Sequence, residues 1–302
     1  VLIFEEKTEA FTVSIGISSD EKYYFITSSD HNTSEQYFFN INEKIPTPKL
    51  VQKREKGIIY SVNSWDGNFY MHTNKDAEDF KIEKSDDIKK KKWETFIPAK
   101  DETLIGGLTF LKKWILRSEI SNALGKIFVK NLETNHEEEL VFSEEEVFDG
   151  GISLTQKDRD TDVIYISYST PKTQNRVYSY NLKTRKKQLV KEQIIPSGHN
   201  PDDYIVERFD CESHDGRKVP LTITRHKKTK INGKANLLLY GYGSYGNSMS
   251  PSFSSTRLSL INRDIIWVTA HIRGGLERGM KWWKEGKLLN KKNTFKDYIA
   301  VA

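Results

Sequence analysis

Short runs of alternating apolar and polar residues fill the first two hundred positions, and these runs recur at a regular distance. One series of strand-like runs lies at Tyr23–Thr27, Phe69–Thr73, Trp114–Ser118 and Val163–Ser167. A second series follows at Tyr37–Phe39, Phe80–Ile82, Ile127–Val129 and Val177–Ser179, and both repeat at steps of 43 to 50 residues. Two strand series with one period are typical of β-propeller blades, whereas a β-sandwich needs no repeat. We therefore expect a partial propeller of about four blades over residues 1–200.

The pattern changes after the turn-rich segment Gly198–Tyr204. Two alternating runs on either side of Asp215 and the glycine that follows it predict a hairpin. Beyond it, Leu237–Tyr240 and Ile265–His271 are continuous apolar runs, which are typical of buried strands in a parallel sheet. Residues 201–302 are therefore expected to form the first part of an α/β domain.

Helices are predicted in three places in this second domain. Ser254–Leu260 and Glu277–Lys284 have helical spacing of their apolar residues, and Thr294 with Asp297 forms a capping-box-like helix start. The chain stops at Ala302, inside the last of these helices and without a stop signal. We interpret this end as a truncation of the domain.

A glycine-rich bend follows the first apolar run of the second domain. Gly241, Gly243 and Gly246 alternate with Tyr242 and Tyr245. Glycines at this spacing allow a sharp turn and a close approach of backbone to a ligand. A tyrosine hydroxyl held in such a bend can donate to the oxyanion of a tetrahedral intermediate. The alternative is an ordinary strand and turn with core aromatics.

Four motifs occur in a fixed order: YGYGSYG from Tyr240, FSS-RLSL from Phe253, RGG from Arg273 and GKLL-KKNTF from Gly286. Together they resemble the start of the peptidase domain in the prolyl oligopeptidase family, above all in its oligopeptidase B branch of trypsin-like peptidases. The resemblance implies a propeller in front of an α/β-hydrolase domain that cuts short peptides after Lys or Arg, with no cofactor or metal. Because the family propeller has more blades, it also implies that N-terminal blades are missing from this chain.

The nucleophile of this peptidase fold is not found in the sequence. The fold carries its serine in a G-x-S-x-G elbow, followed by an acid and a histidine. No serine of this chain fits that pattern, and Ser244, which comes nearest, has Tyr242 in place of the first glycine. By resemblance, the whole triad lies beyond Ala302. We expect the chain to be inactive alone.

The resemblance assigns roles to several residues that are present. Tyr242 is the oxyanion donor, and Tyr245 lines the substrate pocket. Ser250 and Ser252 stand where family members can carry acidic residues for a second basic substrate residue, and a neutral hydroxyl cannot pair with a cation. Leu276 replaces a third family glycine, so its Cβ could strain a turn that needs a positive φ.

Two further polar residues leave alternatives open. Arg273 could bind a substrate carboxylate or form a structural ion pair. His271 ends a strand, where ligand sites gather in α/β folds, and could act as a base or be a packed structural histidine. No nucleophile motif stands beside it.

Composition narrows the classes of partner and location. The net charge is +5, and acidic residues flank the basic run Lys89–Lys92, which favours a solvated loop over a nucleic-acid site. The scattered histidines suit no metal site, and no apolar run or leader suggests a membrane or secretion. Cys211 is the one cysteine, so we expect a cytoplasmic protein without an internal disulfide.

Three hypotheses follow for this chain. It is one piece of a split enzyme whose triad comes from complementary chains, or a truncated or decayed product without activity. The third hypothesis is a propeller module that binds peptides or proteins without catalysis.

Overall fold

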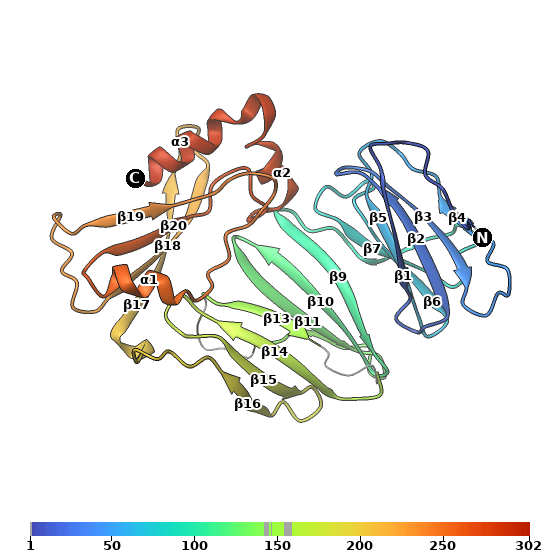
Figure 1. Ribbon diagram of the computed structural model, residues 1–302, viewed down its shortest axis with the longest axis horizontal. Helices are drawn as coiled ribbons and strands as arrows, with labels where there is room; N and C mark the ends of the chain where they lie inside the picture. Colours follow the sequence, from blue (N-terminus) through green and yellow to red (C-terminus); the bar gives the residue numbers. More distant parts are fainter. Residues whose placement is uncertain (1, 142–144, 146, 154–158) are drawn as a thin grey trace. The chain divides into compact units, whose positions relative to one another are not determined.

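The computed structural model describes residues 2–141, 145, 147–153 and 159–302 (Figure 1). The chain divides into two compact units. The first comprises Val1–Asp101 with Ile105–Phe110, and the second comprises Glu102–Leu104 with Leu111–Ala302. In the described residues, no helix is long and apolar enough to cross a membrane.

Two complete four-stranded sheets lie in the first unit, each a meander in which chain neighbours pair antiparallel. Their strands are β1 (Thr12–Ile17), β2 (Tyr23–Ser29), β3 (Ser34–Asn40), β4 (Lys49–Gln52), β5 (Tyr60–Trp65), β6 (Asn68–Thr73), β7 (Lys81–Ser85) and β8 (Glu94–Ile97). One apolar core, which includes Phe25, Phe38, Val62 and Phe69, joins the two sheets. Apolar side chains that alternate along the middle strands therefore hold this unit together.

The next eight strands repeat the same plan in two further four-stranded sheets. They are β9 (Thr103–Leu111), β10 (Trp114–Ser121), β11 (Leu124–Asn131), β12 (Glu137–Glu139), β13 (Asp149–Ser153), β14 (Val163–Ser169), β15 (Arg176–Asn181) and β16 (Lys187–Glu192). Leu116, Val129, Ile164 and Ile166 are among the side chains of one buried core that joins the two sheets.

These sheets confirm the prediction of about four propeller blades. The first series of repeated runs falls on the second strand of each sheet, and the second series falls on or overlaps the third. Middle strands carry the clearest pattern because they pair on both edges and face the core. The outer strands β1 and β16 are exposed along their whole length and gave no repeat.

The second unit continues into a mixed sheet with the order β17-β18-β20-β19. Its strands are β17 (Tyr204–Glu212), β18 (Lys218–His226), β19 (Leu237–Tyr240) and β20 (Ile266–Ala270). The β19 and β20 strands pair parallel, whereas β17 with β18 and β18 with β20 pair antiparallel. Its helices are η1 (Pro201–Asp203), α1 (Ser255–Ile261), α2 (Gly279–Lys284), η2 (Leu288–Asn290) and α3 (Lys292–Val301). The core between this sheet and α3 contains Val219, Ala270 and Trp282 of α2, and Tyr298 and Val301 of α3 pack against it.

Two local predictions in this region are wrong. Leu237–Tyr240 is not buried: Leu237 is 54% and Tyr240 is 42% exposed, because β19 is the last strand in the order of this sheet and has one described neighbour. Thr294 does not begin a helix, since α3 starts at Lys292 and Thr294 lies buried in its first turn. The hydroxyl of Thr294 is engaged with another loop rather than with the helix end.

Truncating a side chain in the core between the sheets β9–β12 and β13–β16 should show how strongly these blades are packed. Leu116→Ala removes a fully buried side chain, and we expect it to lower the free energy of unfolding by about 2–5 kcal/mol. Leu189→Ala on the exposed strand β16 is the control, with an expected change of about 0.5 kcal/mol or less. Urea unfolding followed by circular dichroism measures both. Equal losses in the two variants would contradict the assigned core.

Candidate functional site

Two glycine bends lie against each other at the carboxyl ends of β19 and β20. The Tyr242 bend comprises Gly241–Gly246, and the RGG bend comprises Arg273–Gly275. Gly246 N–H donates to the Gly274 carbonyl oxygen at 3.0 Å. A Cβ on Gly274 would lie 2.0 Å from the Gly243 carbonyl oxygen, and a Cβ on Gly243 would lie 2.8 Å from the carbonyl oxygen of Arg273. Both glycines also have a positive φ. The backbones approach so closely that neither position has room for a side chain.

The paired bends present two phenols outside the core. The side chain of Tyr242 is 43% exposed and that of Tyr245 is 76% exposed. Tyr245 holds a φ of 56°, a left-handed conformation that few residues other than glycine adopt. This exposure weighs against the alternative of core aromatics. The roles of oxyanion donor and pocket lining stay predictions.

The two serines assigned to a second substrate subsite lie on the segment before α1. Ser250 is exposed and Ser252 is half-buried. Arg257 Nη1 donates to the Ser252 carbonyl oxygen at 3.0 Å. The role of these two serines in a second substrate subsite stays a prediction.

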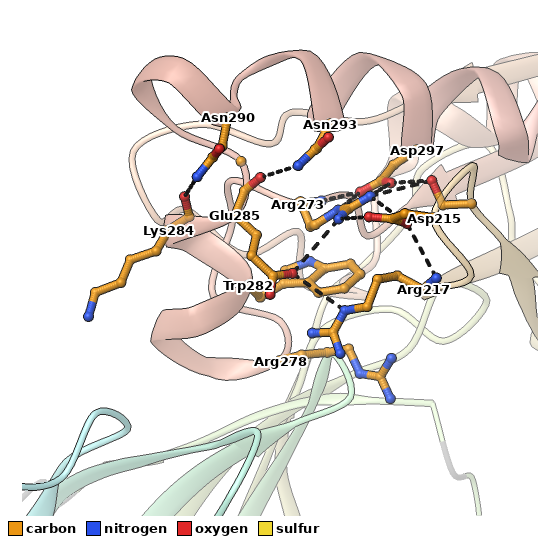
Figure 2. A network of polar contacts seen from close by, with 12 residues as sticks. Asp215, Arg217, Arg273, Arg278, Trp282, Lys284, Glu285, Asn290, Asn293 and Asp297 are labelled. Carbon is orange, nitrogen blue, oxygen red and sulfur yellow. Dashed lines mark hydrogen bonds and ion pairs between the residues drawn. The ribbon is translucent and has the colours of Figure 1, made fainter.

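Arg273 forms the ion pair that the sequence left as one of two alternatives. Its side chain is 1% exposed and Asp297 is fully buried. The guanidinium donates to both Asp297 carboxylate oxygens, at 2.8 and 2.6 Å, and to Asp215 at 2.6 Å (Figure 2). Its hydrogen bond to Asp215 lowers the pKa of that carboxyl to about 2. The substrate-binding role of Arg273 stays a prediction, and its donors here point to carboxylates of its own chain.

The ion pair belongs to a larger polar network that joins four elements (Figure 2). Ser213 Oγ donates to Asp297 at 2.6 Å, and Arg217 lies 3.4 Å from Glu285. Three arginines, at positions 217, 273 and 278, have their guanidinium carbons between 5.5 and 5.8 Å from the centre of the Trp282 ring. The network therefore fixes the RGG bend to the β17–β18 hairpin, to α2 and to α3.

His271 is a packed histidine in this structure. It is fully buried, and its Nε2 lies 2.9 Å from Thr222 Oγ1. Burial lowers its pKa to about 3, so the ring is neutral near pH 7. This buried position agrees with the interpretation of His271 as a packed structural histidine.

Two features near the RGG bend were not foreseen. Glu277, at the start of the helix predicted over Glu277–Lys284, is 1% exposed, and Met249 N–H donates to it at 2.9 Å. Burial raises the pKa of Glu277 to about 7. The strain expected at Leu276 is absent, because its φ is not positive and its side chain lies over Gly246 instead. Periodicity could not show that a charged residue would turn inward here.

Comparison with known proteins connects this site to one family. The family model described as prolyl oligopeptidase, N-terminal β-propeller domain, matches residues 1–193, and the prolyl oligopeptidase family model matches residues 251–302. The boundary expected at residue 200 stays a prediction.

Similar proteins are longer than this chain. Dipeptidyl aminopeptidase BI of Pseudoxanthomonas mexicana and Protease 2 of Moraxella lacunata are each 32% identical over 305 residues, which cover all of this chain but 42% and 43% of theirs. Oligopeptidase B from Trypanosoma brucei with covalently bound antipain superposes with a TM-score of 0.91 at 29% identity, over 99% of this chain and 44% of that structure. The chain thus spans less than half the length of the relatives it matches.

Removing the carboxylate of the buried pair should destabilise the second unit. Asp297→Ala leaves the Arg273 guanidinium buried without its main partner, at an expected cost of about 3–5 kcal/mol in the free energy of unfolding. Glu139→Ala, which removes an exposed ion pair with Lys126, is the control, with an expected change of about 0–1 kcal/mol. Urea titrations of both variants give the comparison. If both substitutions lower the free energy of unfolding by similar amounts, the buried pair stabilises the chain no more than the exposed one does.

Glu277 should make stability depend on pH. Its pKa in the folded chain, about 7, is above the ordinary value of 4.5, so the folded state binds a proton more tightly than the unfolded state. The free energy of unfolding should therefore fall as the pH rises from about 4.5 to 7, then level off. Glu277→Gln cannot ionise and should lack this fall. If the free energies of unfolding of the parent chain and of Glu277→Gln differ by the same amount at every pH from 4.5 to 8, this prediction is wrong.

Proposed function

The chain belongs to the prolyl oligopeptidase family, and we propose that it forms the propeller and oxyanion part of a serine peptidase that hydrolyses short peptides after Lys or Arg. The observation that supports this most is the pair of interlocked glycine bends that hold Tyr242 at the end of β19. Nothing in a simple strand connection requires two bends to pack backbone against backbone.

The chemistry assigned to Tyr242 is electrostatic. When a serine attacks the peptide carbonyl, negative charge develops on the carbonyl oxygen, and a pre-positioned hydroxyl donor stabilises it. Collapse of the intermediate releases the amine and leaves an acyl-serine, which water then hydrolyses. No serine of this chain lies in a G-x-S-x-G elbow, and by resemblance the serine, acid and histidine of these steps lie outside the chain. We propose that a complementary polypeptide segment supplies them and that this chain alone is inactive.

Specificity for Lys or Arg follows from the oligopeptidase B likeness. Protease 2 and oligopeptidase B are among the similar proteins, but another at 32% identity is a dipeptidyl aminopeptidase. We assign Tyr245 to the pocket wall and expect no preference for a second basic residue, because Ser250 and Ser252 carry no charge and the Arg257 guanidinium donates to the Ser252 carbonyl oxygen. We also propose a cytoplasmic location, since Cys211 offers no internal disulfide.

One observation favours a second candidate function, a propeller module that binds peptides or proteins without catalysis. Strand β1 presents Val13, Ile15 and Ile17, all about half exposed, at alternate positions. Alternate residues of a strand point to the same face, so this is an open apolar surface on a sheet edge. Calorimetric binding of short peptides without turnover would support this candidate.

A chimera tests the peptidase proposal directly. The chain would replace the segment of the Moraxella Protease 2 that aligns with it, the relative would supply the remaining sequence, and hydrolysis of an arginyl amide would be measured. We expect activity in the chimera and none in the chain alone. Tyr242→Phe in the chimera should lower kcat by about 10²–10³-fold with a smaller change in KM.

Tyr240→Phe is the matched control, because it removes a phenol hydroxyl from the strand before the bend. We expect it to leave kcat within about twofold of the parent chimera. A folded chimera without activity, equal effects of the two substitutions, or reaction of the isolated chain with a serine-directed fluorophosphonate would each contradict the proposal.

A further inference from the structure

The amino end of α3 contacts the bend that carries Tyr242. The ammonium of Lys291 donates to the carbonyl oxygen of Gly243 and lies 2.7 Å from Ser244 Oγ. Gly243 and Ser244 are the two residues that follow Tyr242 in the chain. A single charged group therefore holds the backbone directly after the phenol.

Thr294, one helical turn further on, contacts both glycine bends. Its buried hydroxyl lies 2.8 Å from the Arg273 carbonyl oxygen and 3.1 Å from that of Gly286, and it can donate to either. Its methyl group would lie only 2.5 Å from a Cβ on Gly243. The hydroxyl thus fastens the RGG bend, while the methyl fills the space that glycine leaves at position 243.

The Tyr242 bend has few hydrogen bonds of its own. Its backbone donors at Gly246 and Asn247 reach Gly274 and Ser244, each at 3.0 Å. Gly243, Tyr245 and Gly246 all have positive φ values, so no regular ladder fixes the segment. A loop with so few internal bonds is held by what packs on it, and here that is α3 and the RGG bend.

We propose that Lys291 and Thr294 are positioning residues that set where the bend holds the Tyr242 phenol. Lys291 fixes the bend from its carbonyl side, and Thr294 joins it to the RGG bend. The inference rests on the proposed function only in taking Tyr242 as the oxyanion donor. The mechanical part concerns this chain alone and can be measured without a triad.

Hydrogen exchange in the isolated chain tests the mechanical part. Lys291→Met keeps the length of the side chain but removes the donor, and Thr294→Val keeps the shape but removes the hydroxyl. We expect each to speed amide exchange at Gly246 and Asn247 by about tenfold. Lys291→Arg and Thr294→Ser retain a donor and should restore most of the protection.

Thr222→Val is the matched control, because it removes a buried threonine hydroxyl that bonds His271 and not the bend. It should leave exchange at Gly246 and Asn247 unchanged. Unchanged exchange in Lys291→Met and Thr294→Val would overturn the proposal. So would an equal rise in Thr222→Val, or a rise spread evenly over all amides of the second unit.

The chimera described above separates this inference from the proposed function. Lys291→Met should lower kcat at least about tenfold with Tyr242 present, and by much less in a Tyr242→Phe background, because both act on one donor. Equal effects in both backgrounds would overturn positioning of the phenol. If Tyr242→Phe alone changes nothing, the oxyanion role fails, while the exchange result still decides whether Lys291 and Thr294 hold the bend.

Discussion

The pairing of Arg273 with Asp297 is the interaction on which the rest of the second domain depends. Removing two opposite charges from water is costly, and the cost is offset only when both are close and their remaining hydrogen-bonding atoms are engaged. Here the carboxylate accepts from the guanidinium, from the backbone N–H of Arg273 and from Ser213. The geometry leaves little freedom for the RGG bend or for α3 to move separately.

A series of contacts leads from this ion pair to Tyr242 at the surface. The ion pair fixes the RGG bend, and Gly274 of that bend accepts from Gly246 of the next. Lys291, directly before α3, contacts Ser244 of the Tyr242 bend, and Thr294 in the first turn of α3 donates to the Arg273 carbonyl oxygen. Tyr242 stands at the end of this series of contacts, with its phenol outside the core. The buried Arg273–Asp297 pair thus supports the bend that carries the Tyr242 hydroxyl, without contacting that hydroxyl itself.

The blades and the family could be predicted from the sequence, but the interior of the site could not. Middle strands such as β2 and β14 repeat visibly because burial imposes alternation on them, and the four motifs are specific in their order. The partners of Arg273 lie 24 and 58 residues away, and periodicity carries no information about pairs at that distance. Local rules also failed where tertiary contacts compete: Thr294 matches a helix cap but bonds another loop. Nothing in the sequence around Glu277 indicated that this carboxyl would be buried.

We propose above that Tyr242 is held as an oxyanion donor for a nucleophile outside this chain. A crystal structure of the chimera with a peptide aldehyde bound covalently to its serine would test this most directly. We predict that the Tyr242 hydroxyl lies about 2.7–3.1 Å from the hemiacetal oxygen. A phenol turned away, with another group donating to that oxygen, would contradict it.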